Sequence, residues 1–121
     1  MDNVTNIKEK LAGLTDQAYK LAFILTLSEE GAEQTVVAAA ARLCRAKADG
    51  DIKELFFKAV CAEAKNVRTE PMTAERITER FGVKSDDFYE FIKLPARQRA
   101  VLHLTEYENM TAEQAERIAG K

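Results

Sequence analysis

An all-α fold is predicted from three features of the sequence. Apolar residues recur at spacings of three and four along most of the chain, which is the period of an amphipathic helix. No stretch alternates apolar and polar residues over a useful length, so no β-strand is expected. The 121 residues include 5 Gly and 2 Pro, which are too few for a loop-rich β fold. A chain of this length can form one domain, or two small lobes that share a core.

The N-terminal part of the chain predicts helices that pack as one bundle. They are expected over residues 3–14, 16–27, 32–48 and 52–67. Asp16 stands where it can cap the second of them. The helix from Ala32 to Ala48 is rich in alanine, and such small side chains allow helices to pack closely. Its apolar residues cover more than one stripe, so part of this surface is expected to remain exposed.

The C-terminal part predicts further short helices. Pro71 marks their boundary with the bundle, because the residue before a proline is pushed out of the helical region. Thr73 and Ser85 open two short helices. Pro95 stands in the first turn of the next helix, and Thr111 caps the last one.

The charge of the chain bears on its partners. The formal net charge is −2, from 18 Lys and Arg against 20 Asp and Glu. This balance removes the general basic field expected of a protein that grips nucleic acid unaided. Any contact with DNA is therefore expected to be weak or indirect, or to be assisted by a protein partner.

Cysteine usage and hydropathy favour a cytoplasmic location. Cys44 and Cys61 lie among apolar helical residues and are expected to be small buried thiols, not metal ligands. The longest apolar stretches, residues 21–27 and 35–41, are far shorter than the roughly 20 residues that a bilayer requires. The N-terminus has acidic and polar residues where a signal peptide needs an apolar run. No membrane contact is expected.

No catalytic constellation is found in the sequence, so the chain is not expected to be an enzyme. The single histidine, His103, stands beside leucines, with no cysteine or acid at ligand spacing. A partly buried helix residue is the expected interpretation. Neither a nucleophile with an adjacent base nor a glycine-rich phosphate loop occurs, and no metal or cofactor is expected.

The segment from Leu94 to Gly120 carries a more specific pattern. It reads Leu-Pro, then Gln-Arg followed by Val-Leu and Leu, a Glu before the turn, Met-Thr, and Ala with Ile ahead of Gly. This pattern resembles region 4 of RNA polymerase sigma factors of the sigma-70 family, particularly the extracytoplasmic-function group. Residues 18–37 and 57–68 look like a worn region 2 of the same group. The order of the two matches along the chain is also that of the family.

The resemblance implies a layout and a set of partners. It implies a region 2-like helical bundle over residues 1–69, a helical linker over 70–93, and a region 4-like remnant over 94–121. The remnant is a partial helix-turn-helix. In the family the recognition helix that reads bases follows the position of Gly120, and the sequence ends at Lys121. Independent promoter reading is therefore not expected, and full sigma activity is expected only if the native chain continues past Lys121.

Departures from the family pattern indicate which residues meet a partner. The family carries an acidic residue and a glutamine on the face that docks the polymerase clamp, around positions that here hold Gln34 and Val37. A charged and polar docking surface has thus become partly apolar. The residues expected to bind a protein partner are Gln34, Val37, Ala40, Arg97 and Arg99. The residues expected to make any residual DNA contact are Thr111, Gln114, Arg117 and Lys121.

Two of these assignments have alternatives that the residues leave open. The basic residues of the region 4-like stretch face several glutamates, so a solvated, salt-bridged surface is the alternative to a phosphate or polymerase contact. Residues 73–94 also look superficially like a helix-turn-helix. Their second helix begins with Ser85-Asp-Asp, whose carboxylates oppose phosphate binding, so a packed helical linker is the better interpretation.

Two functions follow as hypotheses. The first is a sigma-factor-like, bacterial-type protein that acts in transcription mainly through contacts with RNA polymerase, a sigma factor or an anti-sigma factor. The alternative is an all-helical module, unrelated to transcription, that binds another partner or forms a homodimer through its alanine-rich helix.

Overall fold

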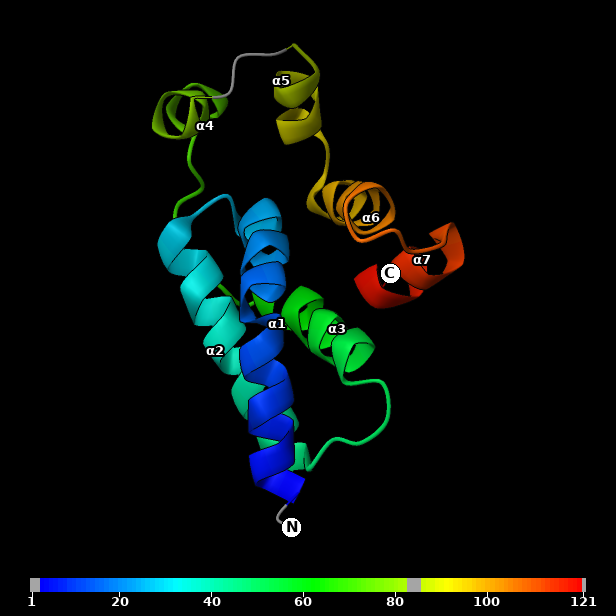
Figure 1. Ribbon diagram of the computed structural model, residues 1–121. Helices are drawn as coiled ribbons and strands as arrows, with labels where there is room; N and C mark the ends of the chain where they lie inside the picture. Colours follow the sequence, from blue (N-terminus) through cyan, green and yellow to red (C-terminus); the bar gives the residue numbers. More distant parts are fainter. Residues whose placement is uncertain (1–2, 83–85, 121) are drawn as a thin grey trace.

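The computed structural model confirms the all-α prediction. The structure describes residues 3–82 and 86–120, and within these ranges it contains α-helices and no strand (Figure 1). The helices are α1 (Asn3–Thr26), α2 (Glu29–Ala46), α3 (Ile52–Ala64), α4 (Ala74–Phe81), α5 (Asp86–Lys93), α6 (Ala96–Glu106) and α7 (Ala112–Ala119). Ser85 and Lys121, both named in the sequence analysis, lie outside the described residues.

The predicted break between two N-terminal helices is wrong. One continuous helix, α1, covers both, and Asp16 lies exposed inside it. The apolar stripe explains the continuity, because buried Leu11 and Ala18 are seven residues apart and therefore stay on one face of a helix. Thr15 adds a hydrogen bond within the helix, from its Oγ1 to the carbonyl of Leu11 at 3.0 Å. An acidic residue that can cap a helix does not end one while the apolar stripe remains in phase.

Polar side chains fix where the later helices begin. The Ser28 hydroxyl accepts a hydrogen bond from the amide of Gly31 at 3.0 Å, so α2 starts at Glu29, before the expected Ala32. The same arrangement opens α3, where the Asp51 carboxylate accepts from the backbone amide of residue 54 at 3.1 Å. It also opens α4 and α7, where the caps are Thr73 and Thr111, as the sequence indicated.

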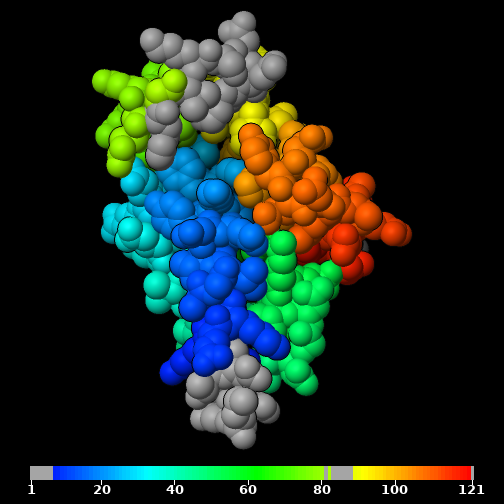
Figure 2. All heavy atoms as spheres, viewed as in Figure 1, coloured from blue at the N-terminus to red at the C-terminus, as the bar shows by residue number. Residues whose placement is uncertain are grey.

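One hydrophobic core is shared by α1, α2, α3, α6 and α7. Helices α1, α2 and α3 pack against one another, α6 packs on α1, and α7 packs on both α6 and α3. In Figure 2 the atoms of α6 and α7 lie against those of α1 and α3. Residues of the C-terminal helices that are buried in this core are Ala100, Leu104, Ala115, Ile118 and Ala119. The predicted region 4-like part therefore completes the core of the predicted bundle.

Helices α4 and α5 lie together at the end of the molecule away from the N-terminus (Figure 1). An ion pair ties α4 to the start of α2, with 3.3 Å between Arg80 Nε and Glu29 Oε1. Ile77 of α4 is 1% exposed, so this helix buries an apolar side chain although it is short. Helix α4 is thus tied to α2 and buries one of its own side chains.

Gly31 allows the segment before α4 to cross the first turn of α2. The amide of Met72 donates to the carbonyl of Leu27 at 2.7 Å, which holds this segment close to the turn. A Cβ atom on Gly31 would lie 2.5 Å from Thr69 Oγ1 and 3.1 Å from a methyl group of Val67. The close approach of the two segments therefore requires a residue without a side chain.

Replacing Gly31 with alanine should destabilise the protein. We expect Gly31→Ala to lower the free energy of unfolding by about 1–3 kcal/mol, because the added methyl group forces backbone or side chains apart. Gly13→Ala is the matched control, since Gly13 is exposed within α1 and nothing lies within 4 Å of its added Cβ. The control should raise stability by about 0.5–1 kcal/mol through helix propensity. Urea unfolding followed by circular dichroism measures the free energy of unfolding of both variants. Equal changes in the two variants would contradict the close approach of residues 67–69 to Gly31.

Candidate interaction surface

The outer face of α2 presents the expected partner-binding residues together. The inner face buries Ala32, Thr35, Val36, Ala39 and Leu43. Because a helix turns 100° per residue, Gln34, Val37 and Ala40 lie away from most of these positions. The structure confirms that separation for Gln34 and Val37, which are exposed, and leaves Ala40 half-buried. We call the surface formed by Glu30, Gln34, Val37 and Ala40 the α2 face.

An exposed apolar side chain stands at the centre of the α2 face. Val37 is 69% exposed, more than Leu102, another large apolar side chain at the surface, which is 40% exposed. Burying such a side chain against a partner is worth about 1.5–2 kcal/mol, whereas leaving it in water contributes nothing to folding. Val37 is thus available for a contact that the chain itself does not make.

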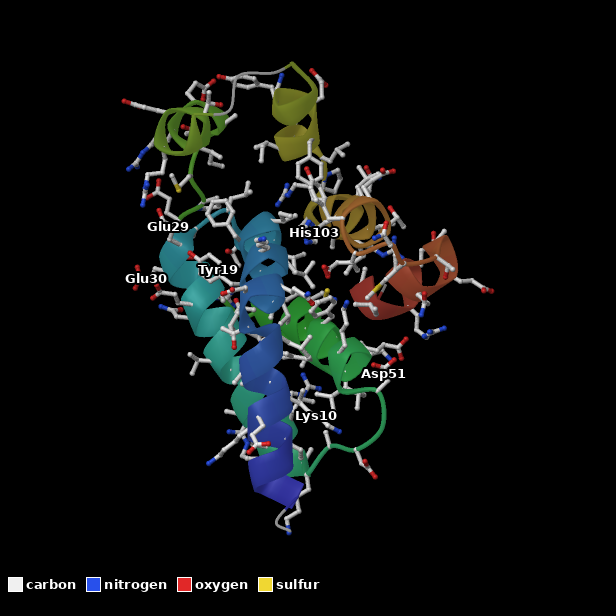
Figure 3. All side chains as sticks on the ribbon, viewed as in Figure 1. Lys10, Tyr19, Glu29, Glu30, Asp51 and His103 are labelled. Carbon is white, nitrogen blue, oxygen red and sulfur yellow. The ribbon has the colours of Figure 1, made fainter. Side chains whose placement is uncertain are left out.

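A carboxylate that the sequence reasoning missed also belongs to the α2 face. Gln34 Nε2 donates a hydrogen bond to Glu30 Oε1 at 3.3 Å, so an amide one turn before Val37 lies together with an acid two turns before it. The signal was present in the sequence, because residues four apart are neighbours on a helix. Figure 3 shows Glu29 and Glu30 at the beginning of α2.

Acidic side chains gather at the start of α2. Glu29 and Glu30 occupy the first turn, where carboxylates interact favourably with the helix dipole. Burial, and after it the charges of Glu29 and Glu33, raise the pKa of the neighbouring Tyr19 hydroxyl above its ordinary value, and the charge of Arg80 opposes this shift. The α2 face therefore combines an apolar centre with an acidic end.

Arg99, an expected partner-binding residue, instead lies inside the protein. It is 7% exposed, and its guanidinium donates to carbonyl groups at the ends of other helices. Nε donates to Ile24 at 2.7 Å and Nη2 to Leu25 at 3.3 Å, both near the end of α1. Nη1 donates to Ile92 at 3.2 Å and to Leu94 at 2.5 Å, at the end of α5. Arg99 therefore joins α1, α5 and α6.

Arg97 is exposed and makes a different contact within the chain. Its Nε donates to the carbonyl of Gly120 at 2.5 Å, which links the first turn of α6 to the end of α7. The rest of its side chain faces solvent. Of the two arginines expected to meet a partner, Arg97 is therefore the one at the surface.

Removing the Arg99 guanidinium should cost much of the stability of the protein. We expect Arg99→Met to lower the free energy of unfolding by about 3 kcal/mol, because it leaves several half-buried carbonyl groups without their donors. Arg99→Lys should also be destabilising, since an ammonium cannot reproduce the planar fork. Arg97→Met is the matched control on the same helix and should cost less than about 1 kcal/mol. Thermal and urea unfolding compare them, and similar losses from Arg99→Met and Arg97→Met would show that the buried contacts are unimportant.

Three of the four residues expected to touch DNA make contacts within the chain, and the fourth, Lys121, lies outside the described residues. Thr111 and Gln114 form a capping box. The backbone N–H of Gln114 donates to Thr111 Oγ1 at 3.1 Å, and the backbone N–H of Thr111 donates to Gln114 Oε1 at 3.2 Å. Arg117 Nη2 donates to Glu54 Oε1 at 2.6 Å and so ties α7 to α3. That ion pair was not foreseen, because nothing in the local sequence connects residues 54 and 117.

His103 is buried between α6 and the rest of the core, as expected of a helix residue. It is 6% exposed and stacks on Tyr107 with 5.3 Å between ring centroids (Figure 3). Its Nδ1 has no hydrogen-bond partner among the described residues. Burial lowers the pKa of His103 below its ordinary value, Glu108 opposes that shift, and Lys20 adds to it.

The stability of the protein should depend on pH through His103. A pKa that is lower in the folded state means that the unfolded chain binds the proton more readily. The free energy of unfolding should therefore fall as the pH drops from the ordinary histidine value of 6.5 towards the lower folded-state value. His103→Gln removes this titration, so the difference in stability between the two proteins should change over that interval. Urea unfolding at several pH values tests it, and a difference that is constant with pH would contradict the buried neutral imidazole.

The thiols are free, and no metal cluster is formed by the described side chains. Cys61 is buried, and burial raises the pKa of its thiol to about 11, which makes it a poor nucleophile. Cys44 is half-buried on α2. Within residues 3–82 and 86–120, no three His, Cys, Asp or Glu side chains are placed to hold a metal ion. None of the helices in those ranges is both long and apolar enough to cross a membrane.

Comparisons with models of protein families, with curated proteins and with solved structures give no match to this chain. The α2 face is the surface that unites several of the residues expected to bind a partner.

Proposed function

We propose that the chain is a sigma-factor-like protein that acts in transcription through protein contacts. The partner is RNA polymerase, a sigma factor or an anti-sigma factor, and the α2 face is the surface that meets it. The ordered resemblance to sigma regions 2 and 4 supports the choice of partner. The exposure of Val37 on a helix that is otherwise packed into the core is the observation that carries the choice of surface.

The chemistry of the α2 face fits a protein partner. Interfaces between proteins combine an apolar centre with a polar rim, and the α2 face has Val37 and Ala40 beside Gln34 and Glu30. A nucleic acid is a poor partner for this surface, because the carboxylates at its end repel phosphates. Protein contact is therefore the favoured mode of action.

The described C-terminal residues also favour protein contacts over base reading. Thr111 and Gln114 are engaged with each other, and Arg117 is paired with Glu54. Each would have to leave its present contact before it could reach a phosphate or a base. DNA binding by these residues would thus weaken α7 or its attachment to α3.

The proposal predicts that the partner is lost when the α2 face is charged. Tagged protein is recovered from lysate of its own cells after nuclease treatment, and accompanying proteins are identified by mass spectrometry. With Val37→Glu we expect recovery of polymerase subunits, or of a sigma or anti-sigma factor, to fall at least about tenfold, since a charge at an interface centre is strongly unfavourable.

Leu102→Glu is the matched control, because it places the same charge at another exposed apolar position, on α6. It should leave recovery unchanged, and circular dichroism should show both variants folded. A wild-type protein that recovers no transcription protein would reject the role in transcription. If Val37→Glu and the wild type recover the same amount of the transcription protein, the α2 face is not the surface that binds it.

Self-association through the α2 face is the second candidate function. The observation that favours it is the set of small side chains around Val37, which includes Ala38, Ala40 and Ala41 and allows a second helix to approach closely. Sedimentation equilibrium of the purified protein separates the two functions. The self-associating module would be favoured by two results together: the wild type is a dimer that Val37→Glu converts to a monomer, and the tagged protein recovers no transcription protein.

A further inference from the structure

The outer surface of α2 carries a stripe of residues that the packed helices leave accessible. Helix α2 packs on α1 and α3, and Figure 1 shows it at the outer edge of the molecule, on the side away from α6 and α7. Residues at alternating spacings of four and three follow this surface, and none of them is buried. They are Glu30, Gln34, Val37, Ala41 and Cys44, which we call the outer stripe. Spacing of this kind forms the seam along which two helices pack.

The middle of the outer stripe is apolar, and its side chains are small except for Val37. Ala41 and Cys44 continue the stripe after Val37, and Ala38 and Ala40 stand on its two flanks. These four smaller residues are half-buried, whereas the valine is exposed. Small side chains allow the axes of two helices to approach closely. The outer stripe therefore suits a second helix that places a small residue opposite Val37.

Charged side chains are acidic at the start of α2 and basic at its end. Two of them are engaged with other helices. Arg80 Nε lies 3.3 Å from Glu29 Oε1 at the start of α2. Arg42 Nη1 lies 3.6 Å from Glu63 Oε1 near its end. The remaining charged residues are exposed on the outer stripe or beside it: Glu30, Glu33, Arg45 and Lys47.

The neighbouring segments do not cancel this difference between the two ends. Residues 67–69 lie against Gly31 at the start of α2, and the charges of Arg68 and Glu70 there balance each other. Asp49 follows the end of α2, where its carboxylate accepts a hydrogen bond from the next backbone amide at 2.9 Å. With these residues and both ion pairs counted, carboxylates outnumber cations at the start of α2, and cations outnumber carboxylates at its end.

This order of charge is complementary to itself only when two helices run in opposite directions. A parallel pair brings the two acidic starts together and the two basic ends together, which is unfavourable at both ends. An antiparallel pair brings the acidic start of each helix to the basic end of the other. From the outer stripe and this order of charge, we propose that two copies of the chain pair through their α2 helices in the antiparallel direction.

One register matches the side chains along the seam. In an antiparallel pair with two-fold symmetry, the numbers of facing residues have a constant sum, and each contact occurs twice. The register that places Val37 opposite Ala41 of the second copy also places Gln34 opposite Cys44. A larger side chain then faces a smaller one at each of these positions, which fills the space between the helices.

The same register pairs opposite charges on both flanks of the seam. Glu33 and Lys47 are two seven-residue repeats apart and so stand on the same flank. The two-fold axis brings each flank against the same flank of the other copy, so Glu33 of each copy faces Lys47 of the other. On the opposite flank, Arg45 lies within about one turn of Glu30 of the second copy.

The pair regulates the surface to which the proposed function assigns a partner, and it rests on that proposal for this consequence alone. A copy whose Val37 is covered by a second copy cannot offer it to a transcription protein. Helix α2 has 18 residues and is about 27 Å long, so one pair of such helices buries less surface than an obligate dimer does. The two copies can therefore separate when another partner competes for the α2 face.

An added thiol tests the register in the full-length chain. Gln34→Cys places a thiol opposite Cys44 of the second copy, so mild oxidation should link two copies covalently. We expect non-reducing electrophoresis to show at least about tenfold more linked dimer than for the wild type, because the two native Cys44 residues lie about 15 Å apart along the seam. Cys61 does not compete, since it is buried and burial raises the pKa of its thiol to about 11. Gln34→Cys combined with Cys44→Ser is the matched control and should not be linked.

A charge exchange tests the antiparallel direction. Glu33→Lys and Lys47→Glu should each raise the dissociation constant of the dimer at least about tenfold, because like charges then face each other on one flank. The double variant should pair nearly as the wild type does, since opposite charges face each other again. Glu116→Lys is the matched control, a charge reversal at an exposed position of α7, and it should leave pairing unchanged. Sedimentation equilibrium measures the dissociation constants, and circular dichroism checks that each variant is folded.

Several results would overturn the proposal. A wild-type chain that remains a monomer at its highest soluble concentration would reject the pair, whatever proteins the tagged chain recovers from lysate. Efficient linkage of the wild type, or no linkage of Gln34→Cys, would contradict the register. A double charge variant that pairs no better than the single variants would contradict the antiparallel direction. If the chain instead pairs as described but recovers no transcription protein, the proposed function fails and the pair stands.

Discussion

The buried guanidinium of Arg99 is the interaction on which the arrangement of this protein depends. The last carbonyl groups of a helix have no partner within it, and burial makes that lack costly. Arg99 supplies donors to such carbonyls at the ends of α1 and α5 simultaneously. Its planar fork can do this because it carries five N–H donors in fixed directions. The first turn of α6 is thereby held at the end of α1.

The rest of the C-terminal packing follows from that attachment. Once α6 lies along α1, Ala100 and Leu104 enter the core, and α7 is brought onto α3. Two further contacts then fix α7, one from Arg97 to Gly120 and one from Arg117 to Glu54. The packing of α6 on α1 and of α7 on α3 also determines which surfaces of the other helices stay exposed. The α2 face remains uncovered because the C-terminal helices pack on α1 and α3.

The sequence predicts the secondary structure better than the contacts between helices. Apolar spacing alone is sufficient for the all-α fold, and Thr73 and Thr111 are caps because a hydroxyl next to a helix has a local partner. Asp16 misled the prediction, since a residue that can cap a helix is also tolerated inside one when the apolar stripe continues. A residue that can cap a helix therefore does not by itself predict where a helix begins.

The functional surfaces could be predicted only in part, for a physical reason. The exposure of Val37 follows from helical periodicity within one segment, so the sequence indicates it. Arg99 makes two of its contacts with residues more than seventy positions earlier, at Ile24 and Leu25, and no local spacing encodes such a pair. The Arg117–Glu54 pair likewise joins residues 63 positions apart. The exposure of a residue on one helix can be predicted from the sequence, whereas contacts between distant helices are found only in the structure.

Native-state hydrogen exchange tests most directly whether Arg99 joins the C-terminal helices to the bundle. Amide exchange is measured residue by residue at increasing, subdenaturing concentrations of denaturant. If the attachment is as we describe, buried amides of α6 and α7 open with the same free energy and the same denaturant dependence as those of α1 and α3. If α6 and α7 instead open together at a clearly lower free energy while α1 and α3 remain protected, the C-terminal helices form a separate unit and the central role of Arg99 is contradicted.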